Sequence, residues 1–231
     1  MKKKTAARKS AVKKMRILVE YLIDRSGSMA GVWTETLNGF KVFVNDLKKD
    51  DGVEYFLSLT CFDTLVEQPL VAVPIGRVDP MILGAFPPRG GTALYDALGA
   101  TLKTQRDGDF TKVICVVVTD GEENSSQTET KDSIHTLIDS KLASGKHTFQ
   151  YFGAQPETWS DAKAIGLSAG STYRMDVTRT GETYTMMSNA VRNFANDSTV
   201  FASQNMTRAY ADPNLVAAAN LTVSDDDDIK P

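Results

Sequence analysis

The chain has 231 residues, of which 42% are hydrophobic and 24% charged, and its formal net charge is -3. This composition is typical of a globular protein with one good core, so we expect a single folded domain. No apolar run approaches the roughly 20 residues that a membrane-spanning helix needs, so we expect no membrane segment.

Positive charge is concentrated at the start of the chain. Residues 1–16 carry eight Lys or Arg and no acid, which leaves 18 basic against 29 acidic groups beyond them. An acidic body argues against nucleic-acid binding, except through this basic arm. We expect a flexible arm at 1–14, a folded domain at 15–196, and an extension at 197–231 that contains an acidic tail.

Strands and helices alternate along the body. A run of strand formers follows Arg16, and Trp33, Leu37, Phe40, Val44 and Leu47 then recur at helical spacing. The β-branched run at 113–118 is typical of a parallel strand covered on both faces, and two prolines within 64–75 favour an edge strand. We expect strands at 17–23, 53–62, 64–75, 113–118, 148–152 and 173–177, with helices at 33–47, after Thr92, and at 131–143, 157–165 and 182–194. This alternation predicts an open, mostly parallel α/β sheet with helices on both faces.

Oxygen-bearing side chains follow the strands of this predicted sheet. Asp24, Ser26 and Ser28 come directly after the first strand, Thr92 opens a helix, and Asp120 ends the strand at 113–118. In open α/β sheets, ligands bind at the carboxyl ends of the central strands, so we expect these residues to converge. Five oxygen donors with two carboxylates select Mg²⁺, Mn²⁺ or Ca²⁺, and Mg²⁺ is favoured by its availability.

These residues also carry a family resemblance. Asp24-x-Ser26-x-Ser28, the Gly91-Thr92 step and Thr119-Asp120-Gly121 resemble the metal-ion-dependent adhesion site of von Willebrand factor A (vWA) domains, and the similarity extends over residues 16–194. The segment from Tyr151 to Gln155 resembles stand-alone bacterial and phage vWA proteins. The resemblance implies a Rossmann-like six-stranded sheet in the order 3-2-1-4-5-6 with one antiparallel edge strand. It also implies a cation whose open position binds an acidic side chain of a protein partner.

Three functions follow from this interpretation. The first is a non-catalytic module in which the cation bridges the five residues to an acidic residue of a partner. The second is a Mg²⁺-dependent phosphate hydrolase, but a dehalogenase-like phosphatase would have a second Asp where this chain has Ser26, and no Lys or His is evidently placed for proton transfer. The third is an assembly role in a phage particle or beside an ATPase motor. The oligomeric state stays open.

Other residues receive structural interpretations. Glu20 interrupts the first strand, where the family has an apolar residue, and either pairs with a basic group or faces a water-filled edge. Glu122 and Glu123 are interpreted as solvated loop residues, while Asp96 is either a support for the metal ligands or a polar helix position. Cys61 and Cys115 lie in apolar runs as buried hydrophobes and, without a signal peptide, favour the cytoplasm.

Overall fold

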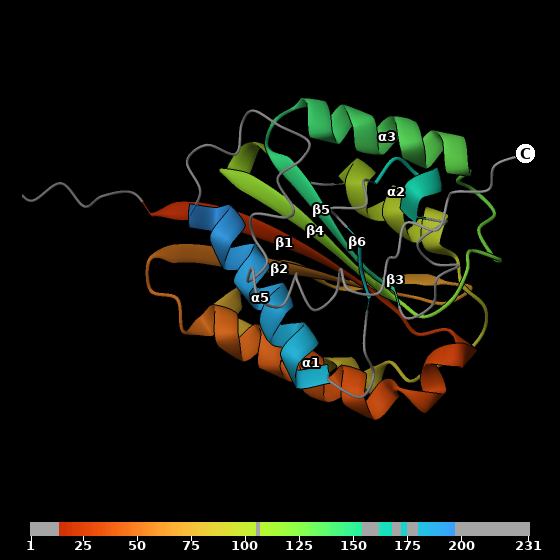
Figure 1. Ribbon diagram of the computed structural model, residues 1–231, viewed down its shortest axis with the longest axis horizontal. Helices are drawn as coiled ribbons and strands as arrows, with labels where there is room; N and C mark the ends of the chain where they lie inside the picture. Colours follow the sequence, from red (N-terminus) through yellow and green to blue (C-terminus); the bar gives the residue numbers. More distant parts are fainter. Residues whose placement is uncertain (1–13, 105–106, 154–161, 168–171, 175–179, 197–231) are drawn as a thin grey trace, which may run out of the picture.

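The computed structural model describes residues 14–104, 107–153, 162–167, 172–174 and 180–196. In this part of the chain, one six-stranded sheet has the order β3-β2-β1-β4-β5-β6, and Figure 1 shows its twist. Only β3 is antiparallel to its neighbour. The expected strand order and antiparallel edge are therefore confirmed. The strands are β1 Met15–Asp24, β2 Val53–Phe62, β3 Val66–Pro74, β4 Lys112–Thr119, β5 His147–Gly153 and β6 Thr172–Arg174.

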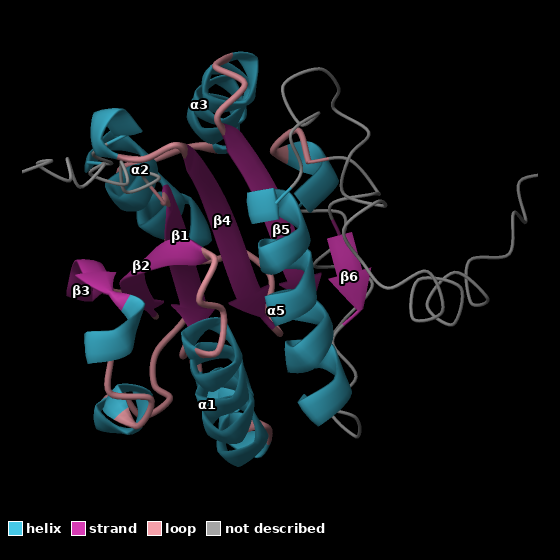
Figure 2. Cartoon of the chain, turned by 90° about the vertical axis from the view of Figure 1, so that its left-hand side faces the viewer, coloured by secondary structure: helices cyan, strands magenta, loops and turns pink. Residues whose placement is uncertain are grey.

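Helices cover both faces of the sheet. Helices α1 (Trp33–Lys48) and α5 (Thr180–Asn196) lie together on one face, while α2 (Leu94–Thr104) and α3 (Lys131–Ala143) lie on the other, as Figures 1 and 2 show. None of the helices in the described residues is long and apolar enough to cross a membrane.

Some expected elements lie outside the described residues. They include nearly all of the N-terminal arm, the C-terminal extension, the first part of the helix expected at 157–165, and the end of the strand expected at 173–177. Within the described residues, the expected strands and helices agree with those of the structure to within two or three residues.

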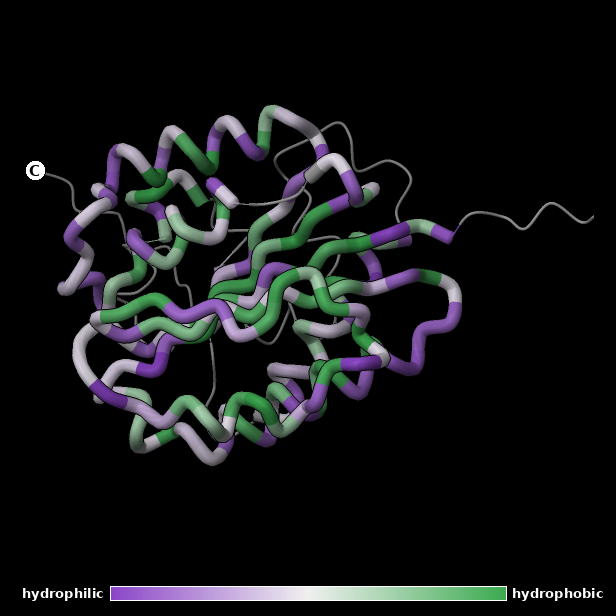
Figure 3. The backbone as a smooth tube through the Cα atoms, turned by 180° about the vertical axis from the view of Figure 1, so that it is seen from behind, coloured by the Kyte–Doolittle hydropathy of each residue, from purple (hydrophilic) through white to green (hydrophobic). Residues whose placement is uncertain are grey.

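The central strands form the core of the molecule. All eight residues of β4 are buried, as are the last eight of β1, and Figure 3 shows these strands as a mainly hydrophobic centre. Apolar side chains that alternate along each strand pack against α1 and α5 on one face and against α2 and α3 on the other. Burial on both faces explains why the run at 113–118 is continuously apolar.

Glu20 is the exception within β1. Its side chain is buried, and it borders a small hollow together with Ser58, Gln68 and Thr101, beside the edge strand β3. The backbone of β1 nevertheless pairs with β2 and β4 without interruption at Glu20.

The contact between α1 and α5 is unusually close at one glycine. A Cβ atom on Gly39 would lie only 2.1 Å from the ring of Tyr184. Two further contacts join the helices, since Ser188 Oγ donates to Asp46 Oδ2 at 3.1 Å and Arg192 donates to Asp46 O at 3.3 Å. Together these contacts hold α5 against α1 and the sheet.

Candidate metal centre

The sheet brings the expected oxygen ligands to one edge. Asp24 ends β1 and Asp120 directly follows β4, and these two strands are parallel neighbours paired through Ile23 and Val118. Strands β2 and β4 flank β1 on opposite sides. This is the switch point at which the loops of an open α/β sheet diverge and leave room for a ligand.

Direct contacts join these loops. Ser28 Oγ donates to Asp120 Oδ1 at 2.7 Å and lies 3.0 Å from Ser26 Oγ. Thr92 also faces this group, because a Cβ atom on Gly121 would lie 3.2 Å from Thr92 Oγ1, 3.4 Å from Ser28 Oγ and 3.8 Å from Asp24 Oδ2. The structure thus gathers all five residues that the sequence singles out.

The spacing of these oxygens suits a small divalent cation. Mg²⁺ prefers octahedral coordination at about 2.1 Å, which places neighbouring ligand oxygens about 2.9 Å apart. The separations of 3.0 Å between the two serine hydroxyls and 2.7 Å between Ser28 and Asp120 are close to this edge length. The hydroxyl and carboxylate oxygens of Ser26, Ser28 and Asp120 are therefore spaced in a way that fits such an ion.

Asp24 is the most buried of the candidate ligands. Its Oδ2 accepts from Thr119 Oγ1 and its Oδ1 from the Ser26 backbone N–H, both at 2.6 Å. Burial raises the pKa of Asp24 to about 6, although these hydrogen bonds oppose the shift. Burial likewise raises the pKa of Asp120, which its hydrogen bond with Ser28 opposes. A bound cation would offset the cost of keeping two carboxylates charged in this environment.

Only two members of the candidate donor set, Asp24 and Asp120, carry a charge. Among the described residues, no group of three or more His, Cys, Asp or Glu could hold a metal ion. A cation at this site would depend on three neutral hydroxyls, from Ser26, Ser28 and Thr92, as well as on two carboxylates. Such a set leaves the ion electron-poor, so that it favours a further anionic ligand.

A charge cluster that no sequence pattern indicated lies beside this site. Arg25, whose side chain is only 3% exposed, forms ion pairs with Asp63 (3.1 Å) and Glu67, and Arg89 donates to the same Asp63 carboxylate at 2.7 Å. Burial alone would raise the pKa of Asp63, but the hydrogen bond from Arg89, that from the Leu65 N–H and the two guanidinium charges lower it below its usual value.

This cluster joins two of the ligand-bearing loops. The Arg25 carbonyl accepts from the Arg89 N–H at 2.7 Å, and Asp63 O accepts from the Ala93 N–H at 2.8 Å, next to Thr92. The position of Asp63 directly after β2 was the available signal, because Asp24 and Asp120 follow their strands in the same way.

Two acidic residues near Thr92 have roles that the sequence did not reveal. Glu123 accepts from the backbone N–H groups of Ser125, Ser126 and Tyr95, so its interpretation as a solvated loop residue is wrong. Asp96 accepts from the backbone N–H groups of residues 127–129. Both carboxylates fold the loop after β4 onto the first turn of α2.

Other residues have structural surroundings. Trp33 and both cysteines belong to the buried core, and burial raises the pKa of Cys61 to about 12. His135 lies in α3 beside Asp139, while the buried His147 pairs with Ser144 through Nδ1. The two histidines lie on separate elements, α3 and β5.

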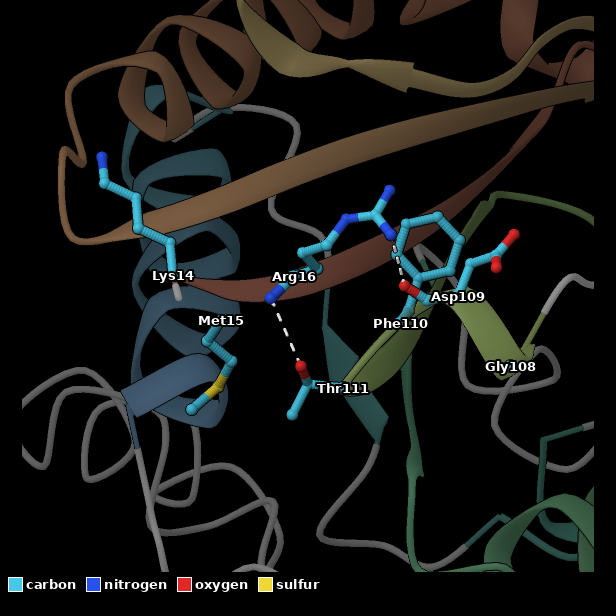
Figure 4. A pocket seen from close by; sticks show the side chains of 7 residues that line it. All are labelled: Lys14, Met15, Arg16, Gly108, Asp109, Phe110 and Thr111. Carbon is cyan, nitrogen blue, oxygen red and sulfur yellow. Dashed lines mark hydrogen bonds between the residues drawn. The ribbon is translucent and has the colours of Figure 1, made fainter. Parts of the chain in front are cut away.

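A second hollow lies at the opposite end of β1 from Asp24. Figure 4 shows Arg16 in it, with its backbone N–H donating to Thr111 Oγ1 at 3.3 Å and its guanidinium donating to Asp109 O at 2.7 Å. The same guanidinium lies 4.6 Å from the ring centroid of Phe56 and 5.0 Å from that of Phe110. Through these contacts Arg16 links the start of β1 to β2 and to the segment before β4, which gives it a structural role.

No family model and no curated protein matches the sequence, whereas solved structures match the fold. The fold is similar to that of proximal thread matrix protein 1 from the mussel byssus with a zinc-occupied metal-ion-dependent adhesion site (MIDAS), at 14% identity and a TM-score of 0.57 over 79% of this chain and 46% of that one. A von Willebrand factor type A structure from Catenulispora acidiphila gives 20% identity and a TM-score of 0.56 over 77% and 43%.

Manganese-loaded TRAP protein from Plasmodium vivax is similar at 16% identity, with a TM-score of 0.53 over 72% of this chain and 71% of that one. This chain spans less than half the length of the mussel and Catenulispora proteins. The structural neighbours are vWA-type domains, and the chain has their Rossmann-like fold, with a mostly parallel six-stranded sheet and one antiparallel edge.

Proposed function

We propose that this chain is a metal-dependent protein-binding module. A divalent cation, Mg²⁺ in the cell, is held by Asp24, Ser26, Ser28, Thr92 and Asp120 and binds an acidic side chain of a partner. The observation that carries the proposal is the convergence of these oxygens at the switch point, where two of their separations are close to the edge of an octahedral coordination shell. Structural neighbours that contain zinc or manganese support a divalent cation in general.

The site favours binding over turnover. Its hydroxyl ligands leave the cation attractive to a carboxylate, and the two histidines lie on elements remote from it in the sequence. Ser28 and its neighbour Gly27 are exposed, so a partner can approach the ligand-bearing loop. We place the module in the cytoplasm because both cysteines are buried and unpaired.

Gly121→Ala tests the metal site while keeping all five proposed ligands. The new methyl group would lie 3.2–3.8 Å from three of their oxygens and crowd an ion bound to them. Gly31→Ala is the matched control, because a Cβ atom there meets nothing within 4 Å. We expect calorimetry to show one Mg²⁺ or Mn²⁺ site in the wild type and in Gly31→Ala, and at least a tenfold weaker site in Gly121→Ala.

The partner is tested with the same three proteins. A partner recovered with the wild type and Gly31→Ala in Mg²⁺, but lost both in chelator and with Gly121→Ala, supports the bridging cation. Equal recovery by all three proteins in chelator would reject metal-dependent binding. Failure of the folded wild type to bind either metal at millimolar concentration would reject the metal site itself.

A further inference from the structure

One short segment binds both backbone polar groups of Thr92. The Oδ1 atom of Asn124 accepts from the Thr92 N–H at 2.8 Å, and the Thr92 carbonyl accepts from the N–H groups of Asn124 (3.0 Å) and Ser125 (3.1 Å). Thr92 is buried and lies just before α2, where backbone N–H groups lack partners within the helix. Asn124 therefore supplies an acceptor that the helix itself cannot provide.

The side chain of Asn124 is itself held in place. Ser125 Oγ donates to the same Oδ1 atom at 2.7 Å. The Glu123 carboxylate accepts from the Ser125 N–H at 2.9 Å and also from the Tyr95 N–H of α2 at 2.9 Å. The segment that contacts Thr92 is thus anchored to the first turn of the helix that follows Thr92.

The residue before Thr92 permits this close approach. A Cβ atom on Gly91 would lie 2.2 Å from Ser125 Oγ and 2.7 Å from Asn124 Oδ1. Both distances are far below a normal contact, so any side chain at position 91 would displace the Asn124 segment. Gly91 and Asn124 are matched to each other across the two loops.

We infer that Asn124 is a positioning residue that fixes Thr92 for the cation, an inference that rests on the proposed metal site. Asn124 lies four residues after Asp120, so one segment carries a ligand and also orients a second ligand from another loop. Its neutral amide accepts the hydrogen bond from Thr92 without adding a third negative charge to the site. A supporting hydrogen bond of this kind typically changes metal affinity by about 10–100-fold.

The test compares three substitutions in the full chain, with Mn²⁺ as the probe. Asn124→Ala removes the acceptor, Asn124→Asp keeps an acceptor at the same position, and Gln127→Ala changes an exposed side chain of the same loop. We expect Asn124→Ala to weaken Mn²⁺ binding by about 10–100-fold and Gln127→Ala to match the wild type. Asn124→Asp keeps the acceptor and adds a negative charge, so we expect it to bind Mn²⁺ at least as tightly as the wild type.

Hydrogen exchange of the metal-free proteins gives a second readout. We expect faster exchange at the Thr92 amide in Asn124→Ala only, with the protection of β1 and β4 unchanged. If the wild type binds Mn²⁺ and Asn124→Ala binds it equally well, this inference is overturned and the metal site stands. If the wild type does not bind Mn²⁺, the proposed function fails. Independently of metal binding, an unchanged exchange rate of the Thr92 amide in Asn124→Ala would reject the positioning role.

Discussion

At the scale of single residues, hydrogen bonds from neighbouring groups orient the candidate ligands. Thr119 Oγ1 and the Ser26 N–H each bind one carboxylate oxygen of Asp24. Arg25, between Asp24 and Ser26 in the sequence, points instead into the ion-pair cluster with Asp63. Asp24 and Arg25 thus anchor this loop through buried contacts, while the serine hydroxyls of the same loop stay available to a ligand.

The Asp63 cluster makes folding sensitive to acid. Because the pKa of Asp63 is lowered in the folded protein, its contribution to stability is present above its unfolded pKa and is lost as the pH falls through the folded value. We expect Asp63→Asn to reduce the free energy of unfolding at pH 7 by up to about 3 kcal/mol, since Glu67 still pairs with Arg25.

Denaturant titrations between pH 7 and pH 3 check this prediction. The loss of stability on acidification should be smaller in Asp63→Asn than in the wild type. Asp51→Asn, at an exposed position, serves as the control and should follow the wild type. An equal pH dependence in all three proteins would show that Asp63 does not contribute through its charge.

At the scale of elements, the packing of α5 on α1 depends on a glycine within a helix. Alanine is normally about 1 kcal/mol more favourable than glycine in a helix, so a glycine at position 39 needs an explanation from packing. The Tyr184 ring occupies the space in which a Cβ atom on Gly39 would lie. The close contact lets α1 and α5 cover the same face of the sheet.

Gly39→Ala should therefore destabilise the protein by about 1–3 kcal/mol, the usual cost of overpacking, despite the better helix propensity of alanine. Gly181→Ala in α5 is the control, because a Cβ atom there meets nothing within 4 Å. Thermal unfolding should show a lower midpoint for the first variant and an equal or higher one for the second. Equal midpoints in Gly39→Ala and the wild type would mean that Tyr184 moves aside at little cost.

At the scale of the whole molecule, the sheet provides the support and three loops provide the site. Strands β1 and β4 place two carboxylates side by side, and the segments around Arg25, Asp63 and Asn124 bind the loops to one another. Buried Asp24, with its pKa raised to about 6, makes the charged site costly to folding at neutral pH. A cation that binds only the folded state would offset this cost.

Metal binding should thus raise the stability of the whole chain. At a metal concentration 100 times the dissociation constant, linkage predicts about 2.7 kcal/mol of added stability. We expect Mg²⁺ to raise the unfolding midpoint of the wild type and of Gly31→Ala, with the effect reversed by chelator and largely absent in Gly121→Ala. An equal rise in Gly121→Ala would place the stabilising ion elsewhere.

The amino-acid sequence by itself determined the elements and where the five candidate oxygen ligands lie relative to them. Local patterns sufficed for this, because apolar periodicity records which face is buried and because parallel strands end at a common edge. The strand order came from the family resemblance and is confirmed by the structure.

Only the tertiary structure decided which polar groups support the ligands. Arg25 meets Asp63 across 38 positions of the sequence, and Thr92 meets Asn124 across 32, so neither pair leaves a local pattern. Glu123 looks like a solvated loop acid until its hydrogen bonds to α2 are seen. Hydrogen bonds and ion pairs depend on distances of a few ångströms between segments that fold together, and the order of residues alone does not specify those distances.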